Sequence, residues 1–387
     1  MAGKLMHALQ YDSYGGGAAG LKHVEVPVPS AKKDEVLIKL EATSLNPYDM
    51  KIQNGVARPF LPRSFPYIPS NSSILLIQTL FCTFHFLIPN FSDDLIYINK
   101  IYVATGIDIA GEVVAVGPGV ENFKTGDKVV AVLSASVSAH SMLWSNLLAL
   151  DIFLEVIPVK HNAFDVYGAR GVRTWDLAHA INLVAMKSAF LHLAILCSGG
   201  GLAEFAVAKK SLSVARPPEI SAAEAAGLPI AGLTAYEALT QFAGVKLDGS
   251  GNQKNILITA ASGGVEGSAL KSPSGKKYDA VIHCARAPET PWSTLEPNLS
   301  ENGKVIHISP SPGVMITFAV KKLTFSKKQL IPLILTPNGE KLKHLVNLAK
   351  EGKLKTVIDS KYPLSNAEDA WAKGIDGHAT GKIIVEP

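Results

Sequence analysis

The stretch that most constrains the fold runs from Asn255 to Cys284 and reads NILITAASGGVEGSALKSPSGKKYDAVIHC. Its first part is an apolar strand followed by small residues and paired glycines, the pattern that opens a dinucleotide-binding unit. A helix rich in Ala, Leu and Val is expected next, but a polar run and then a second apolar strand follow. A complete βαβ unit needs about 30 residues, so the segment from Val265 to Tyr278 is too short to hold one. The sequence therefore predicts a cofactor turn whose helix and next strand are missing.

The residues on either side of this turn predict an α/β domain. Before it, Ser221–Ala226 and Gly232–Ala243 are expected to be helices broken by Pro229, and a capping box of Ser221 and Glu224 should start the first. After it, YDAVIHCA and GKVIHISPSP are short apolar strands without strict alternation, the second opened by an Asn-Gly turn. Such strands are typical of a parallel sheet buried on both faces. The C-terminal residues predict helix, strand, helix and strand.

The N-terminal part has a different character and predicts mostly strands. Residues 1–69 alternate apolar and polar positions in several runs, and residues 107–133 give two more strands separated by glycine turns. A short helix is expected over Asn46–Gly55, with Pro47 at its first position. A chain of 387 residues has two domains as its natural expectation, and this part is predicted to be a small β-barrel-like domain.

Composition excludes several classes of protein. The net charge is only +4 and the lysines are scattered, so no basic surface for nucleic acid is indicated. Cys82, Cys197 and Cys284 form no disulfide framework and no four-cysteine zinc site, and neither C-x-x-C nor H-E-x-x-H occurs. No cleaved signal or transit peptide is evident at the N-terminus. The apolar run Ser73–Ile88 is shorter than the roughly 20 residues of a membrane-spanning helix.

Six motifs occur in an order that carries a resemblance to a known family. They are EATSLNPYDMKIQNG, IDIAGEVVAVGPGVENFKTGDKVV, GGGLAEFAVA, AAGLPIAGLTAYEAL, ILITAASGGV and DGHATGKIIVEP. Together they make the chain similar to the quinone oxidoreductase branch of the medium-chain dehydrogenase/reductase superfamily, and most similar to the plant chloroplast envelope quinone oxidoreductase homologues. Each motif alone is weak evidence, whereas six in order are strong.

The resemblance implies a fold with two domains. One is a GroES-like β-barrel catalytic domain, and the other is a Rossmann-like doubly wound parallel sheet that binds NADPH. The GroES-like domain is expected to comprise residues 1–69, 105–134, 199–216 and 335–387. The Rossmann-like domain is expected to comprise residues 217–334 and to be incomplete after residue 265.

The resemblance also implies hydride transfer without zinc. Zinc-dependent members of the superfamily have a cysteine at the position of Asn46 and a His-Glu pair at the positions of Ile107 and Asp108. No set of zinc ligands remains at these positions. Without a metal ion, hydrogen bonds alone polarise a carbonyl group, which favours reduction of an activated alkene over oxidation of an alcohol.

Site residues follow from the matched motifs, and each has a structural alternative. Asn46 is expected to reach the nicotinamide, or to cap the short helix, or both. By resemblance Tyr48 is expected to line the substrate pocket, although a packed rim aromatic is the favoured alternative. Thr234 matches a threonine beside the nicotinamide, and its alternative is a helix hydroxyl bonded to a carbonyl group. Asn46 and Tyr48 are the predicted catalytic residues.

The rest of the predicted cofactor site lies near the carboxyl ends of strands and at the C-terminus. Ser262, Gly263, Gly264 and Val265 should present backbone N–H groups to the pyrophosphate. Cys284 and Ser309 each follow a strand where the cofactor crevice is expected, and Lys382 matches a family lysine near the cofactor. The alternatives are a small buried hydrophobe for Cys284 and a solvated surface side chain for Lys382. His307 is expected to be a partly buried histidine satisfied by the backbone.

Two further segments depart from the family pattern. Residues 71–104 and 135–198 interrupt motifs that would join cleanly without them, and both are rich in Phe, Leu, Ile and Ser. One hypothesis is an isoform with two retained introns and one skipped exon. The rival hypothesis is a divergent paralogue with inserted subdomains, and sequencing the transcript would decide between them.

Two functions remain open at this point. The first is an NADPH-dependent, zinc-independent reductase of quinones or α,β-unsaturated carbonyl compounds. The second is a cofactor-free structural or binding homologue at a plastid envelope. By resemblance the chain is expected in the chloroplast, peripherally at the envelope and as a homodimer, with the cytoplasm as the alternative location.

Overall fold

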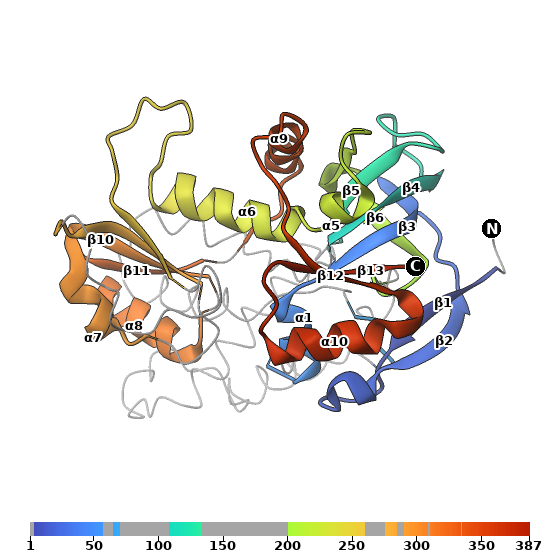
Figure 1. Ribbon diagram of the computed structural model, residues 1–387, viewed down its shortest axis with the longest axis horizontal. Coiled ribbons are helices and arrows are strands. Elements are labelled where there is room, and N and C mark those ends of the chain that lie inside the picture. Colours follow the sequence, from blue (N-terminus) through green and yellow to red (C-terminus); the bar gives the residue numbers. More distant parts are fainter. Residues whose placement is uncertain are drawn as a thin grey trace, which may run out of the picture.

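The computed structural model describes residues 4–56, 65–69, 108–133, 200–259, 275–284, 290–308, 310–333 and 335–387. The segments 71–104 and 135–198, and the glycine turn at 262–265, lie outside the described residues. Within the described residues, two sheets lie at opposite ends of the molecule and helix α6 (Pro229–Glu237) lies between them (Figure 1).

One sheet is a barrel-like arrangement of largely antiparallel strands. Its path is β12-β13-β3-β4-β5-β7, and β6 also pairs with β3. The strands are β3 (Glu35–Leu45), β4 (Asp108–Val116), β5 (Lys128–Val132), β6 (Phe205–Lys209), β7 (Ser213–Ala215), β12 (Ile358–Pro363) and β13 (Lys382–Glu386). A separate hairpin-like pair is formed by β1 (Leu5–Gln10) and β2 (Lys22–Pro27). The C-terminal strand β13 therefore joins the N-terminal strand β3 in one sheet.

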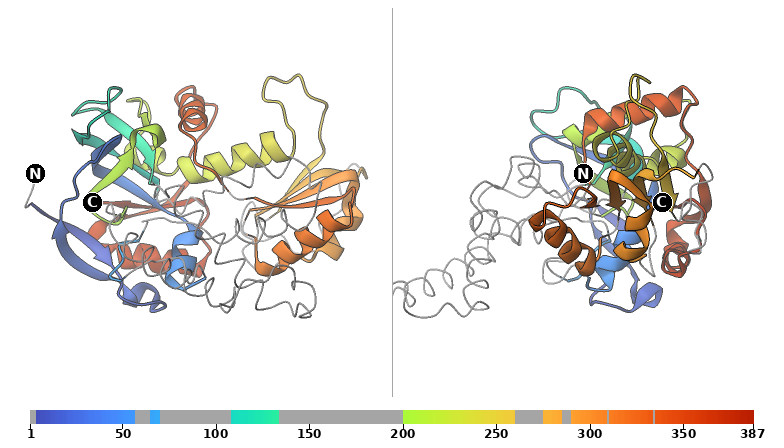
Figure 2. Two further views of the ribbon diagram at one scale, coloured as in Figure 1. Left: turned by 180° about the vertical axis from the view of Figure 1, so that it is seen from behind. Right: turned by 90° about the vertical axis from the view of Figure 1, so that its left-hand side faces the viewer.

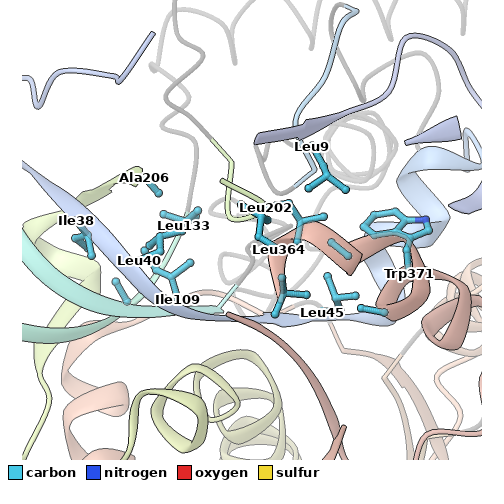
Figure 3. Packing of buried hydrophobic residues seen from close by; sticks show 14 of the residues in the cluster. Leu9, Ile38, Leu40, Leu45, Ile109, Leu133, Leu202, Ala206, Leu364 and Trp371 are labelled. Atoms are coloured by element: carbon cyan, nitrogen blue, oxygen red, sulfur yellow. The ribbon is translucent and has the colours of Figure 1, made fainter. Parts of the chain in front are cut away.

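The core of this part is built around Trp371. Its side chain is fully buried on α10 (Ala367–Asp376), and its indole N–H donates to Gln53 Oε1 at 2.9 Å. Leucine and isoleucine side chains from β1, β3 and β4 point into the same cluster (Figure 3). An indole buried with its N–H satisfied adds apolar area without the cost of an unpaired donor. This packing fixes α10 and α1 (Pro47–Gln53) against the sheet.

The other sheet is parallel throughout and has the order β11-β10-β9-β8. Its strands are β8 (Ile256–Thr259), β9 (Tyr278–His283), β10 (Leu299–His307) and β11 (Gln329–Pro332). Val281 and Val305 pack against α7 (Trp292–Leu295) and α8 (Pro312–Leu323) on one face. Ile282 and Ile306 pack in a second cluster on the other face. The expected burial on both faces is confirmed for β9 and β10.

Figure 2 shows from two further sides that α7 and α8 lie against the parallel sheet. The remaining elements are α5 (Ala222–Ala226), α9 (Gly339–Lys350), a π-helical turn (Ala238–Phe242) and 3-10 turns at Gly17–Gly20, Lys210–Leu212, Glu296–Asn298 and Leu364–Asn366. The α/β fold class with a barrel-like part and a parallel sheet agrees with the prediction. None of the helices in the described ranges is both long and apolar enough to cross a membrane.

Two local predictions differ from the structure in detail. The expected break between two helices is present, but the second helix, α6, begins at Pro229 rather than at Gly232, because the first helical position needs no N–H donor. Asn302 and Gly303 do not form a turn before a strand; they lie inside β10, where the register with β9 shifts between Leu299 and Lys304. A Cβ on Gly303 would stand 2.9 Å from the Tyr278 carbonyl oxygen, so this irregularity requires a residue without a side chain.

Candidate active site

A cluster of buried polar groups lies where α1, β4, α6 and β13 meet. It consists of Asn46, Asp49, Asp108 and Lys382, and is called the Lys382 cluster below. Asn46, Asp49 and Asp108 are buried, and the side chain of Lys382 is 14% exposed. A charged cluster in an apolar interior is costly unless its members satisfy one another. The contacts among these four side chains therefore decide what the cluster can do chemically.

The start of α1 places two members of the cluster. Asn46 is the N-cap residue, Pro47 occupies the first turn, and Asp49 completes a capping box. The Asn46 backbone N–H donates to Asp49 Oδ2 at 2.8 Å. The structural alternative considered for Asn46, a helix cap, is therefore confirmed. Its side-chain amide lies in the polar cluster as well.

Lys382 reaches this amide from the first residue of β13. Its Nζ donates to Asn46 Oδ1 at 2.7 Å and lies 3.5 Å from Asp108 Oδ2. Asn46 Nδ2 lies 3.4 Å from the same carboxylate oxygen. Asn46 and Lys382, which are 336 positions apart in the chain, are brought into contact because β13 pairs with β3. The structure thus joins two of the predicted site residues and adds Asp108, which the sequence did not single out as a site residue.

Asp108 also connects the barrel-like part to α6. Its Oδ1 accepts the Ile230 backbone N–H at 2.9 Å. Ile230 lies in the first turn of α6, where N–H groups have no partner within the helix and the helix dipole favours an anion. Thr234 follows one turn later on the same side of α6, half-buried, about 6 Å further along the axis. Asn46 and Lys382 are therefore linked through Asp108 to the start of α6, the helix that carries Thr234.

Burial raises the pKa of both carboxyl groups. The pKa of Asp49 rises to about 7, mainly because burial penalises the charged form, while the Asn46 N–H and the Lys382 charge lower it. The pKa of Asp108 rises to about 6, again mainly from burial, opposed by Lys382, the Ile230 N–H and Asn46. One ammonium group faces two carboxyl groups, so retaining a proton on Asp49 near neutral pH brings the cluster close to zero net charge.

We expect the Asp49→Asn variant to change how stability depends on pH. A carboxyl group whose folded-state pKa is raised contributes stability below its unfolded pKa and loses it as pH rises through the folded pKa. The wild-type chain should therefore lose stability relative to the variant between about pH 4 and pH 7, by on the order of a few kcal/mol. Urea unfolding of both proteins across this range measures the difference.

Asp34→Asn is the matched control for this experiment. Asp34 is exposed, has a pKa lowered by its hydrogen bond to Lys210, and has a positive φ that asparagine also adopts. The stability that Asp34 contributes is lost only as pH falls through the low pKa range of aspartate. The difference in free energy of unfolding between Asp34→Asn and wild type should therefore stay constant from about pH 5 to pH 8. If the stability difference from wild type changed with pH equally in both variants, the pH dependence could not be assigned to Asp49.

Other predicted site residues lie at the edges of this region. Tyr48, in the first turn of α1, is half-buried against the barrel core, and burial raises its pKa. Cys284 directly follows β9, its thiol is half-buried, and burial raises its pKa too. A thiol with a raised pKa is less reactive, which favours the packing alternative for Cys284. Ser309 and residues 262–265 lie outside the described residues.

A row of polar side chains crosses the carboxyl ends of the parallel strands. Thr259 Oγ1 lies 2.7 Å from His283 Nδ1, and the rings of His283 and His307 are 4.7 Å apart. Their strand positions pair directly, Thr259 with His283 and His283 with His307. His307 is buried more completely than the partial burial expected for it. Its neighbour His283 could not be found from sequence, because register alone brings the two together.

The residues nominated for the nicotinamide end of a dinucleotide carry an amide at Asn46, a hydroxyl at Thr234 and an ammonium at Lys382. Groups of these kinds can hydrogen-bond a carboxamide. The parallel sheet stops at β8 among the described strands, so the side that would carry the adenosine half has no further strand there. The described part of the chain also contains no group of three or more His, Cys, Asp or Glu placed to hold a metal ion.

Comparisons with family models find two matches. Residues 258–385 match the family described as "Zinc-binding dehydrogenase", and residues 87–146 match "Alcohol dehydrogenase GroES-like domain". Among solved structures, a quinone oxidoreductase from Coxiella burnetii superposes with a TM-score of 0.61 at 22% identity, covering 99% of this chain and 100% of that one. A mycobacterial protein complexed with NADPH gives 0.60 at 17% identity, covering 99% and 100%. These two likenesses concern the fold.

Curated relatives are more similar in sequence. The "Chloroplast envelope quinone oxidoreductase homolog" of Arabidopsis thaliana is 50% identical, and the chloroplastic "Quinone-oxidoreductase QR1" of Triphysaria versicolor is 47% identical, each over the whole of both chains. An "NADPH-dependent alkenal/one oxidoreductase" of Arabidopsis thaliana is 26% identical over 99% of this chain and 80% of its own length. The first alignment spans 428 positions, more than the 387 residues of this chain, so the relative has residues where this chain has none.

Proposed function

The chain belongs to the family of plant chloroplast quinone oxidoreductase homologues within the medium-chain dehydrogenase/reductase superfamily, and from that premise we propose its reaction. We propose that the reaction for which its site is built is the reduction of quinones or α,β-unsaturated carbonyl compounds with NADPH and without a metal ion, in the chloroplast, and that the segment missing after Val265 impairs this reaction in the chain as it stands. The observation that carries this proposal is the Lys382 cluster. It places an ammonium and an amide beside α6, where family members bind the nicotinamide.

The chemistry is divided between the cofactor and the chain. NADPH supplies the hydride when it is bound. The chain contributes orientation, through Thr234, and a positive group, the ammonium of Lys382, which Asn46 and Asp108 hold in place. Asp108 holds the ammonium against the start of α6 by its contacts to Lys382 and Ile230. This arrangement suits a reaction in which negative charge develops on a substrate oxygen.

Independence from zinc rests on the residues at the positions of metal ligands. Asn46 is a poor zinc ligand, and the carboxylate of Asp108 already binds an ammonium and a backbone N–H. A zinc ion at this place would have to displace Lys382. The local contacts therefore support reduction of an activated alkene or quinone by hydrogen bonding alone.

We define a restored chain to test this function. It carries the helix–strand–helix segment of a relative grafted after Val265 and lacks residues 71–104 and 135–198. With NADPH and a short α,β-unsaturated ketone, it is expected to oxidise the cofactor at the same rate with and without a chelator, because no zinc is held. Loss of nicotinamide absorbance measures the rate. Turnover that stops on addition of the chelator would contradict the metal-free mechanism.

A further inference from the structure

Reduction of a conjugated carbonyl needs a group that accepts negative charge on oxygen. When a hydride forms a C–H bond at the β-carbon, the alkene electrons move toward the carbonyl group and an enolate results. A quinone gives the anion of a hydroquinone in the same way. A donor aimed at that oxygen is worth most in a water-poor pocket, because it needs no reorganisation during the reaction. In a site without a metal ion, a group of the chain has to supply this donor.

Two side chains of this chain occupy positions that belong to the metal site in zinc-dependent members. Asn46 stands where zinc-dependent members have a cysteine ligand, and Asp108 stands at the glutamate of their His-Glu pair. In this chain both side chains bind one cation, the ammonium of Lys382, at 2.7 Å from Asn46 Oδ1 and 3.5 Å from Asp108 Oδ2. A protein cation thus lies beside the positions that flank a metal ion in other members.

The ammonium has donor capacity to spare, and the amide does not. An ammonium carries three N–H donors, and Asn46 and Asp108 are the acceptors that the described contacts give it. The Asn46 amide turns its oxygen to Lys382, and its nitrogen lies 3.4 Å from Asp108 and 3.5 Å from the Ser44 carbonyl oxygen. The amide is therefore committed to the cluster, and the ammonium is the better donor for a ligand.

We propose that Lys382 is a catalytic residue whose ammonium stabilises the substrate oxyanion in place of a metal ion, with Asn46 and Asp108 as its positioning residues. The proposal rests on the proposed function and changes the role expected for Lys382 from cofactor binding to charge stabilisation. The carboxylate of Asp108 holds the ammonium from the protein side and is itself anchored by Ile230. The side chain of Lys382 remains 14% exposed, whereas that of Asp108 is fully buried.

The step balances without a further reactant. A hydride supplied by bound NADPH would form the new C–H bond, leaving the oxidised cofactor; the alkene pair would become the carbon–carbon double bond of the enolate, and the π pair of the carbonyl group would end on its oxygen. Lys382 donates a hydrogen bond to this oxygen and keeps its proton. Water then supplies the proton that gives the saturated ketone, or the hydroquinone from its anion. The charge pairing between ammonium and oxyanion is the only contribution that the proposal requires of Lys382.

The test uses a phenol as a stand-in for the oxyanion. The full chain, without cofactor, is titrated with 4-nitrophenol at several pH values, and the visible absorbance separates phenolate from phenol. We expect the phenolate to bind at least about tenfold more tightly than the phenol, because a charge-assisted hydrogen bond forms only with the anion. The pKa of the bound probe should fall accordingly, by about one unit or more.

Variants assign this preference to Lys382. Lys382→Met should remove the preference, and the double variant Asp108→Asn, Lys382→Met should do the same without leaving a buried carboxylate unpaired. Lys254→Met should keep the preference for phenolate, because Lys254 is exposed and does not belong to the Lys382 cluster. Equal binding of phenol and phenolate, no saturable binding, or a preference that survives in the double variant would each overturn the proposal. No NADPH enters the experiment, so its result is independent of whether the chain reduces enones.

Discussion

The restored chain is expected to bind NADPH at least about 100-fold more tightly than the chain as it stands, because the graft returns the pyrophosphate site. A helix after the glycine turn offers unpaired N–H groups and a favourable dipole to the phosphates. Each charge-assisted hydrogen bond contributes about 1.5–3 kcal/mol, so losing two reduces affinity by about that factor or more. Fluorescence of the reduced nicotinamide measures both dissociation constants. A micromolar constant for the unmodified chain would contradict the prediction.

The sheet gives a structural reason for this expectation. In a doubly wound dinucleotide fold, the strand before the glycine turn is central, with neighbours on both sides. Here β8 is the terminal strand of the described parallel sheet, and Ile258 within it is 46% exposed. An apolar side chain left exposed on such a strand is what loss of the neighbouring strands would produce. The 428 positions of the alignment, against 387 residues, agree with a deletion.

A chain that lacks residues 71–104 and 135–198 but carries no graft is the matched control. It shares every change of the restored chain except the returned segment. If its NADPH affinity equals that of the restored chain, the two additional segments and not the missing segment limit binding. If all three proteins bind NADPH weakly, the cofactor-free alternative gains support.

Local sequence patterns predict a helix or its cap correctly where one short segment alone determines whether it forms. The helix at Asn46-Pro47 and the capping box of Ser221 and Glu224 both form, the latter with the Glu224 N–H donating to Ser221 Oγ at 3.2 Å. The break between α5 and α6 was also predicted, although α6 begins at Pro229 and not three residues later, because proline is well suited to the first helical position. Helix α8 and strand β11 were not predicted at all.

The sequence predicts which residues belong to the candidate site better than it predicts the contacts between them. The family motifs nominated Asn46, Thr234 and Lys382, and the structure brings Asn46 and Lys382 into contact and links them through Asp108 to the helix that carries Thr234. The direct bond from Lys382 to Asn46 depends on the pairing of β13 with β3, which no local pattern encodes. Asp108 entered the sequence argument only as the loss of a metal-site residue. Its role as the partner of an ammonium and of the first turn of α6 requires three distant segments to meet.

Asn46→Ala in the restored chain is expected to lower kcat by about 10- to 100-fold while changing the NADPH dissociation constant less than about threefold. The substitution removes the acceptor 2.7 Å from Lys382 Nζ, so the ammonium loses its fixed position. Misplacing a group that acts on the transition state reduces the chemical step more than it reduces binding. Steady-state kinetics and a cofactor titration on the same preparation measure the two quantities.

Asn46→Ser separates this role from helix capping. Serine is as good an N-cap residue as asparagine, so α1 should keep its stability, whereas its shorter side chain does not reach Lys382 in the same geometry. We therefore expect Asn46→Ser to unfold at nearly the wild-type urea concentration and yet to turn over as slowly as Asn46→Ala. If serine restores kcat, the effect of alanine came from the lost cap, and Asn46 acts only by starting α1. If both variants keep full turnover, neither the cap nor the contact to Lys382 affects the reaction, and the donor to the substrate oxygen must be sought elsewhere in the pocket.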